Sequence, residues 1–85
     1  MLITLEIPQY NSENGFKFEW EKEFEIITKI ENEEIIISAN RAGLVSLAKQ
    51  LLSLAQENIP SGYHIHFDEY NSLEKGSFEL VIEKI

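Results

Sequence analysis

The chain has 85 residues, 44% of them hydrophobic, no cysteine, and a formal net charge of −8 from 15 acidic and 7 basic side chains. This composition predicts one folded domain over residues 1–85 and excludes a disulfide framework, a thiolate metal site and a disordered chain. An acidic surface repels phosphates and anionic lipids, so the charge disfavours nucleic-acid and membrane binding; it favours a basic protein partner or serves solubility alone.

The N-terminal quarter predicts two strands joined by a turn. Residues 1–7 alternate weakly between apolar and polar and end at Pro8, and a turn cluster follows at residues 11–15. Residues 16–20 then alternate aromatic with charged side chains, which is typical of a half-buried strand with an aromatic inner face.

The first residues also bear on localisation. No basic region precedes Glu6, so the start of the chain does not have the pattern of a secretory signal peptide. No apolar run approaches the ~20 residues that span a bilayer. We therefore expect a cytoplasmic protein.

A hairpin is predicted next. Residues 24–30 alternate again, a polar link occupies residues 31–33, and the isoleucine-rich residues 34–39 form the expected partner strand. Whether residues 16–30 make one bent strand or two is open at this point.

The following segment predicts the one helix of the protein. Asn40 is a favourable N-cap, and leucines and alanines recur at three- and four-residue spacing over residues 41–58. Gly43 in the first turn lowers helix propensity, for which close backbone packing is one explanation.

After the helix we expect a strand at residues 63–67, a loop at residues 69–72 and a last strand at residues 77–84. This order predicts an α+β fold of two layers, with one amphipathic helix packed on a mostly antiparallel sheet of about five to six strands. The helix and the last strands are expected to bury Leu47, Leu51, Leu54, Ile65, Phe67 and Leu80.

The expected strand at 63–67 has one apolar face and one face that holds both histidines of the protein. Side chains alternate between the faces of a strand, so His64, His66 and Asp68 share the face opposite the apolar residues. Two histidines and a carboxylate at this spacing can bind zinc with one position left open, which makes a small metal-binding protein or hydrolase one alternative. The other is a pair of solvated or locally hydrogen-bonded histidines on the outer face of a sheet.

Catalytic motifs are absent from the sequence. It contains no P-loop, nucleophile elbow or dinucleotide-binding fingerprint. General acid–base chemistry needs paired titratable groups in a cleft, and a single helix leaves little material for a deep pocket. We expect no enzymatic activity and no cofactor.

The second half of the chain carries three linked motifs: G-L-X-X-L-A at residues 43–48, G-X-H-X-H-hydrophobic-D at residues 62–68, and G-S-X-E-L at residues 76–80. Together they resemble a bacterial immunity-protein family, immunity family thirty-two of the polymorphic toxin systems. The resemblance implies a protein that binds and neutralises a cognate toxin without catalysis. The two histidines and Asp68 carry over only as positions of the motif.

Many toxins of such systems are nucleases with basic clefts, so the resemblance also implies a basic partner that an acidic face can occlude. We expect toxin contacts on and beside the histidine-bearing face, at His64, His66, Asp68, Glu69, Asn71 and Glu79. Two alternatives stay open. The histidines either contact the partner or hold the neighbouring loop, and an exposed edge strand would also allow a structural adaptor or a homodimer.

Overall fold

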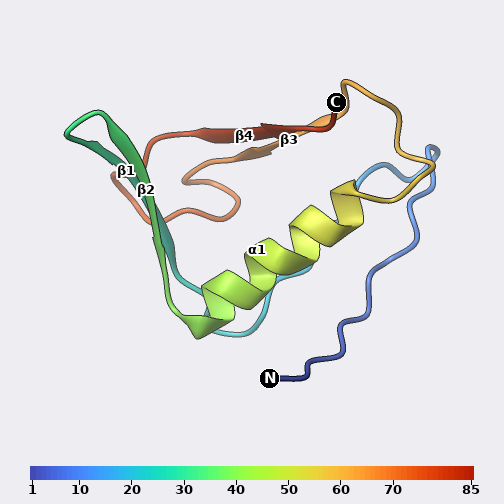
Figure 1. The fold of residues 1–85 in the computed structure, drawn as a ribbon, viewed down its shortest axis with the longest axis horizontal. Coiled ribbons are helices and arrows are strands. Elements are labelled where there is room, and N and C mark those ends of the chain that lie inside the picture. Colours follow the sequence, from blue (N-terminus) through green and yellow to red (C-terminus); the bar gives the residue numbers. More distant parts are fainter.

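Five regular elements are present in the computed structural model, which describes residues 1–85 (Figure 1). They are, in chain order, β1 (Ile26–Glu31), β2 (Glu34–Ala39), α1 (Arg41–Leu54), β3 (His64–Phe67) and β4 (Leu80–Glu83). β1 pairs with β2 and β3 pairs with β4, both antiparallel, in two separate two-stranded sheets. The α+β class is confirmed, but the prediction of one sheet with five to six strands is wrong.

β1 and β2 form the predicted hairpin, in which Glu31 lies opposite Glu34. The two turn residues, Asn32 and Glu33, have φ angles of 51° and 66°. Positive φ at both central positions is the type I′ geometry, whose twist matches that of the flanking strands. The predicted polar link is therefore a two-residue turn.

The start of α1 is capped by a side chain that also ties the helix to the chain just before β1. Oδ1 of Asn40 accepts hydrogen bonds from the backbone N–H of Gly43 at 2.8 Å and of Glu25 at 3.0 Å. A Cβ atom at Gly43 would collide with the carbonyl oxygen of Glu25. The predicted N-cap is confirmed, and close backbone packing explains the glycine.

The buried face of α1 is polar, contrary to the leucine face predicted from the sequence. Ser46 and Gln50 are buried, whereas Leu51 is 47% exposed. Leu54 is buried as predicted, but Leu47 is only half-buried. The helix also ends at Leu54, earlier than predicted.

These polar side chains bind the backbone of the segment before β1, which explains their burial. Nε2 of Gln50 donates to the carbonyl of Glu19 at 2.6 Å, and its Oε1 accepts from the Glu19 N–H at 3.1 Å. Oγ of Ser46 accepts from the N–H of Glu21 at 2.8 Å. Backbone groups need such partners when they are removed from water. Here a helix supplies the hydrogen bonds that a neighbouring strand would otherwise make.

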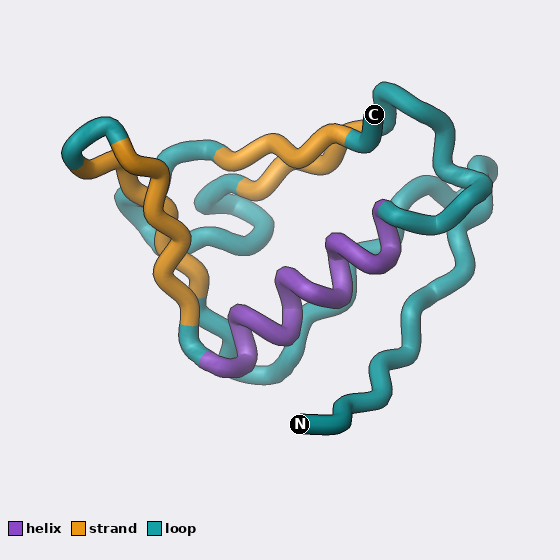
Figure 2. The backbone as a smooth tube through the Cα atoms, viewed as in Figure 1, coloured by secondary structure: helices purple, strands orange, loops and turns teal.

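The two strands predicted within residues 1–20 are absent from the structure, so this prediction is wrong. Figure 2 shows the chain before β1 as loop, and its only bridge joins Asn11 to Gly15. Alternation nevertheless identified the inner face, because Phe18 and Trp20 pack against the core. Their rings stack at a centroid distance of 5.5 Å.

The core lies between α1, the two hairpins and residues 16–24, whose aromatic side chains pack against it. Ile65 and Phe67 of β3 are buried as predicted, and Leu80 packs against the core while half-buried. The complete buried apolar set is Ile26, Leu54, Ile59, Ile65, Phe67 and Leu73. No helix of the protein has the length and apolar character needed to cross a membrane.

The two hairpins are joined through the connection between β3 and β4. The N–H of Glu74 donates to the carbonyl of Ile26 at 2.9 Å, and the N–H of Phe78 donates to the carbonyl of Thr28 at 3.3 Å. Oγ of Ser77 also accepts from the Thr28 N–H at 3.1 Å. The residues predicted to begin the last strand therefore bind the outer edge of β1, and β4 itself begins at Leu80.

Candidate functional site

The outer face of the β3–β4 hairpin carries both histidines. The register places His64 opposite Glu83 and His66 opposite Val81. Directly opposed residues share a face of a sheet, and all four are exposed. We call this set the histidine face. Ile65 and Phe67, which alternate with the histidines in β3, are buried, so the predicted division of this strand into two faces is confirmed.

The two imidazole rings lie close together at the surface. Their centroids are 5.1 Å apart, with the ring planes at 66°. Nδ1 of His64 lies 3.1 Å from the carbonyl oxygen of Gly62. A carbonyl oxygen only accepts, so this Nδ1 donates, and the Nε2 of His64 is left as the free hydrogen-bonding position of the ring.

Asp68 does not join the histidines, because its carboxylate is used by the loop that follows β3. Oδ1 of Asp68 accepts from the N–H of Tyr70 at 2.9 Å and from the N–H of Asn71 at 3.0 Å. In return, Oδ1 of Asn71 accepts from the Asp68 N–H at 3.0 Å, and its Nδ2 donates to the carbonyl of His66 at 2.9 Å. Such side-chain bonds fix a turn locally. The histidine rings make no hydrogen bond to this loop.

The alternative of a three-ligand metal site finds no support in this geometry. No group of three histidine, aspartate or glutamate side chains is placed to hold a metal ion. The two histidines are together, but the carboxylate that would complete the set accepts backbone hydrogen bonds instead.

The remaining expected contact residues border the histidine face. Glu69 and Glu79 are exposed, Glu69 in the loop after β3 and Glu79 directly before β4. Tyr70, which the sequence did not single out, is 99% exposed at the tip of this loop. Val81 and Glu83 were also missed. An antiparallel pairing of the last two strands would have identified them, since it places Glu83 opposite His64 and Val81 opposite His66.

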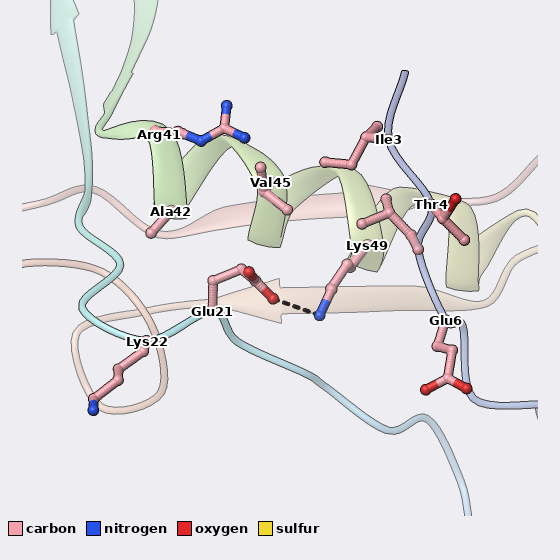
Figure 3. A pocket seen from close by; sticks show the side chains of 10 residues that line it. Ile3, Thr4, Glu6, Glu21, Lys22, Arg41, Ala42, Val45 and Lys49 are labelled. Carbon is pink, nitrogen blue, oxygen red and sulfur yellow. Dashed lines mark hydrogen bonds and ion pairs between the residues drawn. The ribbon is translucent and has the colours of Figure 1, made fainter. Parts of the chain in front are cut away.

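A separate cavity of about 490 Å³ lies between the N-terminal segment and α1 (Figure 3). Nζ of Lys49 donates to the carboxylate of Glu21 across it at 2.6 Å. This hydrogen bond raises the pKa of the Lys49 ammonium above its ordinary value. The pairing thus favours the charged ammonium form of Lys49. It ties α1 to the preceding segment.

Comparison with known proteins identifies a family. The family model for Immunity protein 32 matches residues 34–85, more than half of the chain. No curated protein and no solved structure matches. The matched region begins at β2 and contains α1, β3, β4 and the whole histidine face. The resemblance seen in the sequence is thus confirmed: this chain belongs to the Immunity protein 32 family.

Proposed function

We propose that this protein neutralises its cognate toxin by binding it and covering a functional surface of it, without catalysis. Family membership implies a toxin-neutralising role and a toxin partner in general terms. The observation that carries the proposed mechanism is the histidine face. It is exposed on a hairpin whose opposite face is part of the core, so its side chains are presented on a rigid support.

The chemistry of this surface suits a polar and basic partner. The imidazoles offer hydrogen bonds, Val81 is an apolar side chain 49% exposed, and Tyr70 adds an exposed aromatic ring of the kind enriched at interfaces. Glu83 supplies negative charge on this face, and Glu69 and Glu79 supply it at the border. Together with the net charge of −8, this favours a toxin with a basic cleft, such as a nuclease, met in the cytoplasm.

The expected contact residues divide by role in this proposal. His64, His66, Glu69 and Glu79 contact the toxin directly. Asp68 and Asn71 act indirectly, since their hydrogen bonds hold the loop that displays Glu69 and Tyr70. Removing either one would misplace the border of the surface instead of deleting a contact.

The test is co-expression with the toxin encoded beside the gene for this protein. The native protein should protect the cells and bind the toxin, and the double variant His64→Ala/His66→Ala should keep its fold but protect less. Glu57→Ala, an exposed charge outside the histidine face, is the control. Failure of the native protein to protect or bind would refute the proposed function.

A further inference from the structure

The β1–β2 hairpin extends away from the rest of the molecule (Figure 1), and its two edges differ. The outer edge of β1 is covered, because Ile26 and Thr28 bind the backbone of residues 74–78. The outer edge of β2 has no such cover: its strand makes backbone hydrogen bonds only with β1. A bare strand edge presents N–H and C=O groups that another chain can bind.

One face of this hairpin remains apolar beyond the core. The register places Ile30 opposite Ile35 and Thr28 opposite Ile37, so these four side chains share a face. Thr28 is 3% exposed at the base, whereas Ile37, Ile30 and Ile35 are 42%, 56% and 74% exposed. We call these three isoleucines and the bare edge of β2 the isoleucine edge. Proteins usually shield such edges with lysine, proline or a covering loop, and β2 contains neither lysine nor proline.

The charge around the isoleucine edge is negative. Glu31, Glu33 and Glu34 surround the turn. The one lysine of the hairpin, Lys29, already lies 3.4 Å from a carboxylate oxygen of Glu31. A second copy of this chain would bring the same acidic turn and a further net charge of −8 to the contact. Charge therefore favours a basic partner over self-association.

We propose that the isoleucine edge is a docking surface for the cognate toxin, which adds a strand to β2 with apolar residues over the isoleucines and lysine or arginine beside the turn. This inference rests on the proposed function and names a contact outside the histidine face. Strand addition satisfies the bare backbone groups of β2, and the isoleucines select an apolar face on the incoming strand. The acidic turn supplies orientation and speeds association.

The experiment measures the affinity of purified variants for an inactivated form of the toxin encoded beside the gene. Ile35→Lys places a charge on the isoleucine edge, and Leu52→Lys makes the same change on an α1 leucine that is 50% exposed. We expect Ile35→Lys to weaken binding at least about tenfold and Leu52→Lys to leave it unchanged. Ile35→Thr keeps strand propensity and should also weaken binding. It provides the test if Ile35→Lys fails to fold.

A charge-reversal pair tests the acidic turn. Glu34→Lys should weaken binding several-fold at low salt, and the difference should shrink at high salt; Glu57→Lys, with the same charge change elsewhere, is the control. Equal binding by the native protein, Ile35→Lys and Ile35→Thr would overturn the inference and leave the proposed function standing. If the native protein does not bind the toxin, both the proposed function and this inference are refuted. A native dimer that Ile35→Lys dissociates would assign the edge to a second copy and overturn the toxin contact.

Discussion

The two hairpins share antiparallel pairing but differ in what covers them. In β3, Ile65 and Phe67 are buried and the histidines that alternate with them are exposed, so one face is covered along its whole length. In β1, Ile26 is buried at the base, but Ile30 on the same face is 56% exposed. The alternating pattern defines which residues share a face of a strand. Whether that face is buried depends on another element packing against it.

The largest expected effect tests this difference in cover. Phe67→Ala and Ile26→Ala remove side chains with no exposed surface from the two hairpins, and each should destabilise the protein by about 2–5 kcal/mol. Ile35→Ala, on the exposed part of the first hairpin, should change stability by at most about 0.5 kcal/mol. Chemical denaturation of the three variants measures this. Similar losses for Ile35 and Ile26 would refute the assigned limit of the core.

A smaller effect is expected at the attachment of the first hairpin. In an exposed helix, glycine to alanine gains up to about 1 kcal/mol. Gly43→Ala should instead lose about 1–3 kcal/mol, because its Cβ would collide with the carbonyl of Glu25 just before β1. Thermal unfolding decides the sign, and Gly43→Ser should lose more. A stabilised Gly43→Ala variant would contradict the close approach.

The loop after β3 should show a modest dependence on its side-chain hydrogen bonds. Asp68→Ala removes the acceptor of two backbone N–H groups and should cost about 1–2 kcal/mol. Asp68→Asn keeps an acceptor and should recover most of this loss in the same denaturation measurement. Equal losses for the two variants would show that the negative charge, not the hydrogen bonds, holds the loop.

The smallest effect is expected on the histidine face of the second hairpin. His64→Ala and His66→Ala should each change the stability of the isolated protein by at most about 0.5 kcal/mol, since both side chains are exposed. A chelator should also leave the melting temperature of untagged protein unchanged, because no third ligand stands beside the histidines. A clear loss of stability in either alanine variant would show that the histidines are structural, and a melting temperature lowered by the chelator would show a bound metal.

Much of the local structure was predictable from the sequence. Alternation and a polar link predicted the β1–β2 hairpin, Asn40 predicted the start of α1, and the period-two pattern placed both histidines on an exposed face. These features depend on neighbouring residues, whose preferences are readable in order along the chain. The site was predicted only in part. Val81, Glu83 and Tyr70 were missed, because strand register and loop shape place them beside the histidines.

The tertiary structure decided which surfaces meet. The leucines of α1 made its apolar face the expected inner face, yet Ser46 and Gln50 lie inside because the backbone at Glu19 and Glu21 needs hydrogen-bonding partners there. Residues 16–20 belong to neither sheet, and the backbone of Glu19 bonds to α1 instead. A sequence pattern records which residues share a face, but the element that covers it comes from a distant part of the chain, and buried backbone groups can outweigh side-chain hydrophobicity in that choice.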